Sequence, residues 1–501
     1  MNSQELITTY LLEKKSRTKL SILQFLSDHS FYITRDYLAA HFQLSQLNLT
    51  LYMKELEADL LSLGINEQPV IKKGNFVKIN VPYRALAMSY YRLLVTYCEH
   101  STNYQILVSL LKKDTTSILS ISEHTNFSVS YIYSRMKTIN AFLFHYGITI
   151  NFSKPGKKTI VGNELQLHYC LIDIYWNIHS NVTIHDSSDS IKHAAHTLNL
   201  YVKKEVLQNL ENGMLDKLYL VIHLCLKNFP ITSLEYFRAQ VKAIPDNDLF
   251  THPLFDLLKP NLPLSSDART AINVLARLML SKTETSEVNA QQYALLEGRQ
   301  TPYFCYAQEL IASFSEVFEL SIPEEERILY CLNFIRNQLY YDVLTQNHPN
   351  TTMASYLIYS KKKQQKTKQA IADFYLAFRK SKQNHYPFME RQNEKWLLED
   401  LIHIYDRYKK KEKIVIGINF TRDYYINDDL CSQIEQHFGT KNVLLKKKAM
   451  TQCDIVISDC PLTDLPEKTR IIYLIEGNIT SEKIKEMFKQ LSDHLFDLRQ
   501  E

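Results

Sequence analysis

A repeat with a fixed offset of 83 residues near the N-terminus constrains the fold more than any other feature of this sequence. Residues 36–65 align with residues 119–148. The positions that coincide are apolar residues, serines, histidines and glycines: Leu38 with Ile121, His41 with His124, Ser45 with Ser128, Leu49 with Ile132, Met53 with Met136, Leu56 with Ile139, Leu60 with Leu143, and Gly64-Ile65 with Gly147-Ile148. Two copies of one structural unit are the simplest explanation.

Each copy has the pattern of three helices followed by a hairpin. Ser45 or Ser128 stands where its side chain can cap the longer helix, whose apolar residues fall on one face. A further helix is expected before each pair, at 18–27 and 104–112, and Gly-containing hairpins are expected after it, at 69–81 and 148–162. The pattern therefore predicts two winged helix-turn-helix units.

The chemistry of such a unit is docking on duplex DNA. The second helix of the helix-turn-helix motif enters the major groove, while the hairpin contacts phosphates. Lysines on both hairpins suit the phosphate contacts: Lys72, Lys73, Lys78, Lys154, Lys157 and Lys158. A small helical packing unit with a lysine-rich hairpin is the alternative, but two basic hairpins favour double-stranded DNA as the partner.

The outer faces of the two longer helices differ in polarity. The first carries Leu47, Thr50, Leu51 and Lys54, and the second carries Ser130, Tyr133, Ser134 and Lys137, with Arg135 on its flank. Hydrogen-bond readout of base edges needs polar side chains. We therefore expect the second helix to read bases, and the first to make phosphate and thymine-methyl contacts or to pack against a neighbour.

The distribution of charge along the sequence also favours a polyanion partner for the N-terminal region. Residues 1–163 contain 18 Lys and Arg against 11 Asp and Glu, whereas the whole chain has a net charge of only +4. No apolar run is long enough to span a bilayer, no export signal is visible, and the eight cysteines form no CxxC pair. These features predict a cytoplasmic protein without a membrane partner.

The central region, from residue 164 to about 410, is patterned as helices, and the chain has only 10 glycines. A break near 282–300 divides it into two predicted helical bundles. His223 lies in an apolar helix, where a core histidine is the usual interpretation and a phosphorylated one the exception. The run 361–368 is more typical of a solvated face than of nucleic-acid binding. No catalytic or metal-binding motif occurs, so we expect no enzyme activity, metal or cofactor.

After residue 410 the pattern changes to short β-branched strands at 413–420, 442–447, 454–460 and 470–477. Helices lie between the first two strands and at the end. This order predicts a small parallel α/β domain. The loop after the first strand, 419–425, contains neither glycine nor cysteine, which disfavours a phosphate cradle.

The two repeat units, the helix around His223 and the strands KIVIGINF and CDIVISDCPL together resemble the Mga-type virulence regulators of Gram-positive bacteria, which contain phosphotransferase-regulation domains. The resemblance implies a transcription regulator with two helix-turn-helix units, two regulation domains and a C-terminal domain like enzyme IIB of the sugar phosphotransferase system (PTS). It implies a homodimer or higher oligomer, PTS phosphocarrier partners, and phosphorylation at His223. The matching second position, at an offset of 110, is Asn333, and Asn419 stands where enzyme IIB has its cysteine, with Cys431 inside the next helix.

We therefore expect a mainly α, multidomain DNA-binding regulator that activates virulence or carbohydrate-linked genes. The predicted domains are two winged helix-turn-helix units (1–82 and 83–163), two regulation-like helical domains (164–283 and 284–410) and an enzyme IIB-like α/β domain (411–501). A PTS phosphocarrier component and an RNA-binding antiterminator with regulation domains are the alternatives. The missing cysteine opposes the first, and the duplicated winged units oppose the second.

Overall fold

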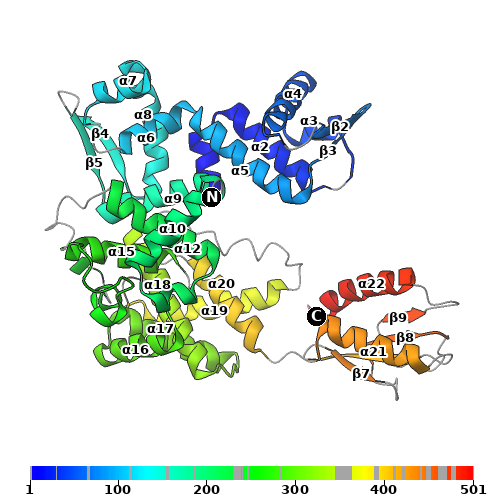
Figure 1. Ribbon diagram of the computed structural model, residues 1–501. Coiled ribbons are helices and arrows are strands. Elements are labelled where there is room, and N and C mark those ends of the chain that lie inside the picture. The colour runs from blue at the N-terminus through cyan, green and yellow to red at the C-terminus, as the bar shows by residue number, and fades with distance from the viewer. Residues whose placement is uncertain are drawn as a thin grey trace. The chain divides into compact units, whose positions relative to one another are not determined.

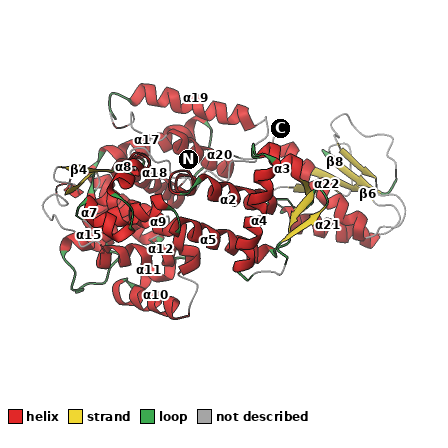
Figure 2. Ribbon diagram, turned by 90° about the horizontal axis from the view of Figure 1, so that it is seen from above, coloured by secondary structure: helices red, strands yellow, loops and turns green. Residues whose placement is uncertain are grey.

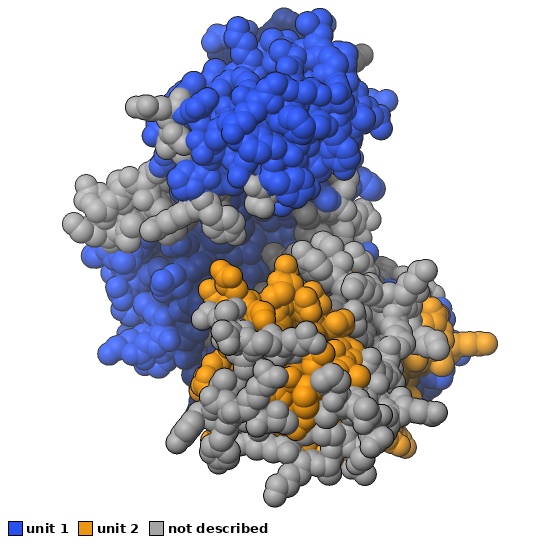
Figure 3. Space-filling model, turned by 90° about the vertical axis from the view of Figure 1, so that its right-hand side faces the viewer, with its two compact units in different colours: residues 1–312, 323–355, 381–397 blue, residues 313–322, 356–380, 398–501 orange. Residues whose placement is uncertain are grey.

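The computed structural model contains helices throughout, two small antiparallel sheets in the first third of the sequence and a parallel sheet near the C-terminus (Figure 1; Figure 2). The described residues are 3–29, 31–64, 68–111, 116–153, 157–183, 188–228, 239, 241–242, 244, 247–280, 284–344, 364–386, 388, 394–409, 413–419, 424–440, 443–446, 453–460, 471–474 and 481–499. The chain divides into two compact units, coloured separately in Figure 3: residues 1–312, 323–355 and 381–397, and residues 313–322, 356–380 and 398–501. A mainly helical fold with a small parallel sheet is thus confirmed.

The first repeat copy forms three helices and a small sheet. Its elements are α2 (Lys14–Ser27), β1 (Ile33–Thr34), α3 (Arg35–His41), α4 (Gln46–Ser62), β2 (Val70–Lys73) and β3 (Phe76–Ile79). β3 lies between β1 and β2 and pairs antiparallel with both. The side chain of Ser45 accepts a hydrogen bond from the Asn48 amide at 3.2 Å, which confirms the predicted cap of α4.

The second copy repeats the order of three helices and a two-stranded hairpin. Its elements are α6 (Thr102–Leu111), α7 (Ile118–Thr125), α8 (Val129–Phe144), β4 (Thr149–Ser153) and β5 (Lys157–Val161). Ser128 caps α8 through the Tyr131 amide at 3.3 Å. α4 begins at residue 46 and α8 at residue 129, so the helices keep the offset of 83.

The turns of the two copies also coincide. Gln43 and Asn126, which are 83 residues apart, both have a positive φ, at 52° and 57°, between the two turn helices. Gly64 and Gly147 do the same after the longer helices, with φ of 68° and 72°. Since glutamine adopts this conformation at a cost that glycine avoids, the shared backbone shape at Gln43 reflects a constraint of the unit and not a local preference.

Among the described residues up to 408, the other elements are also helical. In order these are α1 (Ser3–Leu6), η1 (Ile7–Leu11), α5 (Tyr83–Glu99), α9 (Glu164–Thr183), α10 (Ser188–Tyr201), α11 (Lys204–Asn209), α12 (Asn212–His223), η2 (Leu224–Asn228), α14 (Asp248–Thr251), η3 (Pro253–Phe255), α15 (Ser266–Met279), α16 (Ser286–Arg299), α17 (Pro302–Val317), α18 (Glu324–Leu344), α19 (Gln364–Lys382) and α20 (Glu394–Tyr408). α9 packs against α5, α12, α15 and α18. The run 361–368 lies partly outside the described residues, and its last five residues begin α19.

The prediction of a break in the helical pattern near 282–300 is wrong for most of these residues, because they form α16. Thr285 caps this helix by accepting a hydrogen bond from the Val288 amide at 3.3 Å. Its buried face includes Gln292, whose Oε1 accepts a hydrogen bond from Arg336 at 2.9 Å. A glutamine on the inner face interrupts the apolar periodicity on which helix prediction depends.

The C-terminal sheet confirms the four predicted strands: β6 (Ile414–Asn419), β7 (Val443–Lys446), β8 (Ile455–Ser458) and β9 (Ile471–Leu474). All pairings are parallel, in the order β7-β6-β8-β9. The helices α21 (Tyr424–Phe438) and α22 (Ser481–Arg499) share one buried core with alternate residues of the strands, among them Ile416, Ile457 and Tyr473. Both helices therefore cover the same face of the sheet.

A buried ion cluster joins α15 to α18. The carboxylate of Glu284 lies 3.3 Å from Arg277 and 3.0 Å from Arg336, and the three side chains are 9% exposed or less. Arg277 also donates to the Leu249 carbonyl at 2.6 Å. Burial lowers the pKa of Arg277 to about 10, although the negative charge of Glu284 opposes this effect.

We predict that Glu284→Ala destabilises the first compact unit by about 3–5 kcal/mol, because it leaves two buried guanidinium groups without their shared carboxylate. Urea denaturation followed by circular dichroism measures this loss. Glu324→Ala is the control, since Glu324 pairs with Arg327 at 2.5 Å on the surface and its removal should cost less than about 1 kcal/mol. Equal losses for both variants would contradict the prediction.

Candidate DNA interface

The outer face of α8 is polar and accessible. Its inner face carries the predicted buried stripe: Ile132, Met136, Ile139 and Leu143, with Phe142 beside them. On the opposite side Ser130, Tyr133, Ser134 and Lys137 are exposed, and the Tyr133 ring is 50% exposed. The four expected base-reading residues thus lie on one accessible face of one helix, as the sequence predicts.

Contacts within the second copy restrain several of these side chains. Ser134 donates to the Tyr131 carbonyl at 2.6 Å, and the Tyr133 ring meets Phe152 of β4 edge-on with centroids 5.8 Å apart. Arg135 is half-buried; it donates to the Tyr131 hydroxyl at 2.6 Å and stacks its guanidinium over the same ring. Hydrogen bonds from Thr102 and Arg135 lower the pKa of Tyr131. Arg135 therefore braces α8 and is less accessible than its neighbours.

The lysines of the β4-β5 hairpin are not equivalent. Lys157 is exposed at the start of β5. Lys158 is half-buried, and its ammonium donates to the Leu110 carbonyl at 2.9 Å, which fixes the hairpin to the end of α6. Lys154 lies outside the described residues. Of the two lysines seen here, Lys157 is therefore the more exposed.

The first copy presents a different outer face. Leu47, Thr50, Leu51 and Lys54 of α4 are all exposed, opposite a buried stripe that contains Leu49, Met53, Leu56 and Leu60. The hydroxyl of Thr50 donates to the Gln46 carbonyl at 2.6 Å and accepts a hydrogen bond from Arg35. Its bonding capacity is therefore largely used within the protein.

The lysines of the first hairpin also differ from one another. Lys72 forms an ion pair with Glu57 of α4 at 2.5 Å. Lys73 and Lys78 lie over the ring of Tyr32, with their nitrogens 5.2 and 6.0 Å from its centroid. Tyr32 and Arg35 contact candidate site residues, and sequence reasoning missed them because their partners are distant in the chain and no local motif marks them.

A second missed cluster positions α4 on its neighbours. Lys19 of α2 lies 2.6 Å from Asp59 of α4, the hydroxyl of Tyr97 in α5 donates to the same carboxylate, and the Lys19 ammonium lies over the Tyr97 ring. Burial, reinforced by the bond to Asp59, raises the pKa of Tyr97. Lys19 is 7% exposed, so this is a structural lysine and not a phosphate ligand.

His223 ends α12 and is half-buried, while Leu220 and Ile222 beside it are buried. Its Nδ1 lies 3.4 Å from the Tyr219 hydroxyl, and the two rings have centroids 5.5 Å apart. Its counterpart Asn333, in α18, is also half-buried. The imidazole at residue 223 is therefore partly accessible.

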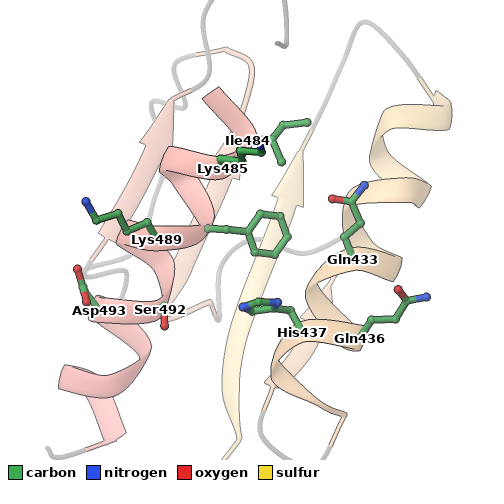
Figure 4. A pocket seen from close by; sticks show the side chains of 9 residues that line it. Gln433, Gln436, His437, Ile484, Lys485, Lys489, Ser492 and Asp493 are labelled. Carbon is green, nitrogen blue, oxygen red and sulfur yellow. The ribbon is translucent and has the colours of Figure 1, made fainter. Parts of the chain in front are cut away.

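At the carboxyl end of β6, Asn419 donates to Ser458 at 3.3 Å and lies 3.8 Å from the sulfur of Cys460. Cys431, the nearest cysteine in the sequence, lies on α21 and is buried in the core of this domain. An open groove between α21 and α22 lies elsewhere in this domain and is lined by both polar and apolar side chains (Figure 4). Its lining residues are Gln433, Gln436, His437, Ile484, Lys485, Phe488, Lys489, Ser492 and Asp493.

Two negative findings hold for the described part of the chain. None of its helices combines the length and the apolar character needed to cross a bilayer. Nor do three or more histidine, cysteine, aspartate or glutamate side chains gather there in a way that could hold a metal ion.

Comparison with known proteins gives one family match. The family model of the Mga helix-turn-helix domain matches residues 87–175, from within α5, through α6, α7, α8 and the β4-β5 hairpin, into α9. No curated protein matches the chain. The match covers the polar face of α8 described above, and such a domain indicates a DNA-binding transcription regulator. This chain therefore carries a Mga helix-turn-helix domain, as expected of a regulator of the Mga family.

Proposed function

We propose that this protein regulates transcription by binding duplex DNA through two winged helix-turn-helix units, residues 1–82 and 83–163. The observation that carries the proposal is the duplicated arrangement: each copy has a capped helix with an exposed outer face, followed by a hairpin that bears accessible lysines. The family match to the second copy supports the same interpretation of the first.

The DNA-binding residues in this proposal have separate roles. Ser130, Tyr133, Ser134 and Lys137 of α8 contact base edges, because they are the polar groups exposed on a helix of the matched domain. Lys54, Lys73, Lys78, Lys154 and Lys157 contact phosphates. Thr50, Lys72, Arg135 and Lys158 act through their bonds to Arg35, Glu57, Tyr131 and Leu110, which orient the surfaces.

Regulation is proposed to occur through the parts that follow. A homodimer or larger oligomer engages two DNA sites at once, and PTS phosphorylation of His223 shifts the balance between monomer and dimer. The partly accessible imidazole supports a phosphorylation site. We propose an enzyme IIB-like role in assembly for the C-terminal domain. Its parallel sheet supports the proposed likeness, and Asn419 at the end of the first strand argues against phosphotransfer.

The proposed outcome is activation of virulence or carbohydrate-linked genes in the cytoplasm. To test DNA binding, the protein is used to enrich duplexes from a genomic library, and an enriched duplex is labelled and titrated with the protein. We expect unlabelled duplex to compete and single-stranded RNA not to compete. Competition by RNA alone would instead support an antiterminator.

The exposed lysines predict a strong dependence on salt. Lys73→Ala and Lys157→Ala should each lower the slope of log K against log salt by about 0.9, since each removes one phosphate contact. Specific and nonspecific duplexes should weaken equally in fluorescence anisotropy titrations. Lys15→Ala is the control. Lys15 of α2 pairs with Glu55 of α4 at 2.5 Å, so its replacement should leave the slope unchanged. A loss confined to one DNA sequence would show that these lysines read bases.

The two outer faces predict different mutant behaviour. Ser134→Ala with Lys137→Ala should reduce discrimination between the selected duplex and random duplex tenfold or more, because a bidentate base contact is worth about 1–3 kcal/mol. Thr50→Ala with Lys54→Ala should lower both affinities together. Quantitative footprinting measures the two ratios. The reverse pattern would assign hydrogen-bond readout to α4.

Charge at His223 should control assembly. A phosphate adds close to two negative charges, so His223→Asp should mimic it partly and weaken both dimer formation and DNA binding. His223→Ala should abolish the response to phosphorylation, and Tyr219→Phe, which removes only the neighbouring hydroxyl, should leave it intact. Size-exclusion chromatography and DNA titration measure both effects. Unfolding of both His223 variants, or wild-type behaviour of both, would refute the switch.

A further inference from the structure

Two leucines occupy the position on α4 at which α8 has two serines. Leu47 is 79% exposed and Leu51 is 46% exposed, and they lie one turn apart on the side opposite the buried stripe. With the offset of 83, their counterparts are Ser130 and Ser134. The same place on two copies of one unit is thus apolar in the first copy and polar in the second.

The polar side chains around the two leucines are engaged with one another. Gln46 donates to Asp36 at 2.7 Å, and Asn75 donates to the other oxygen of the same carboxylate at 2.6 Å. Thr50, between the leucines, bonds to Arg35 and to the Gln46 carbonyl. Hydrogen-bond readout by these polar groups would have to break their contacts, so the leucine side chains are the accessible groups between them.

The charges nearby point to a polyanion as the occupant. Lys54 is exposed one turn beyond Leu51 on the same face, and Lys73 is exposed on the hairpin. The acidic groups are partnered: Glu57 with Lys72, and Asp36 with Gln46 and Asn75. An apolar pair flanked by cations fits a ligand that offers apolar groups within an array of phosphates.

Duplex DNA has such a group in the C5-methyl of thymine, which projects into the major groove. Leu47 is the second residue of α4, and the N-terminal residues of a recognition helix are those that reach base edges. Building on the proposed function, we infer that Leu47 and Leu51 read thymine methyl groups. The first unit then selects A·T pairs by apolar contact, while the second reads bases by hydrogen bonds.

Replacement of thymine by uracil tests this inference, because it removes the methyl group and keeps the base pair. The probe is a duplex enriched from a random-sequence pool by the full-length protein, compared with the same duplex made with deoxyuridine. We expect the wild type to bind the uracil duplex about fourfold more weakly for each methyl contacted. Leu47→Ser with Leu51→Ser, which copies the second unit, should bind both duplexes equally.

Leu61→Ser, at an exposed leucine near the other end of α4 to which no DNA contact is assigned, is the matched control and should keep the full preference for thymine. Thermal melts check that the leucine variant folds, as the exposure of both leucines predicts. The comparison of the two duplexes with the wild-type protein does not depend on any variant. Equal wild-type affinities for both duplexes would overturn the inference while leaving DNA binding intact. An unchanged thymine preference in the leucine variant, with a smaller oligomer in size-exclusion chromatography, would overturn it in favour of a protein contact. Failure to enrich any duplex would overturn the proposed function itself.

Discussion

Burial of one apolar stripe on α4 and on α8 is the constraint on which the rest of the interface depends. Each stripe packs into the core of its own unit, and this fixes by geometry which residues of the helix face solvent. Ser45 and Ser128 set where the helices begin, and the Lys19, Asp59 and Tyr97 cluster holds α4 on α2 and α5. With the inner face fixed, the outer face is free to vary in chemistry.

The two copies share the same backbone arrangement but differ in the residues on the outer face of the longer helix. Caps, left-handed turns and hairpins keep the offset of 83, whereas the outward residues change from Leu47 and Leu51 to Ser130 and Ser134. Hydrogen bonds discriminate base edges by donor and acceptor pattern, and methyl contacts discriminate thymine. Two units that differ in this way would combine two kinds of readout along one DNA site.

Local patterns made the helices, caps and strands predictable, because those features depend on residues close together in the chain. The polar outer face of α8 was predictable for the same reason. Contacts that depend on folding were not: Lys158 resembles any hairpin lysine until the Leu110 carbonyl lies beside it, and Arg35 shows its role only through Thr50. α16 was not predicted because its buried face contains the polar residue Gln292. The partner that makes this burial possible is Arg336, a residue 44 positions away. The thiol of Cys460 lies beside Asn419 only because β6 and β8 are neighbours in the sheet.

α9 offers a physical route from the central helices to the DNA-binding domain. The family match ends within this helix, and the buried carboxylate of Asp173 on it accepts a hydrogen bond from Tyr146, just after α8, at 2.8 Å. α12, which ends at His223, packs against α9, and its Lys217 lies over the Trp176 ring. Since packed helices shift as rigid bodies, a charge that displaces the end of α12 would act on α9, and through Tyr146 on α8, the proposed recognition helix.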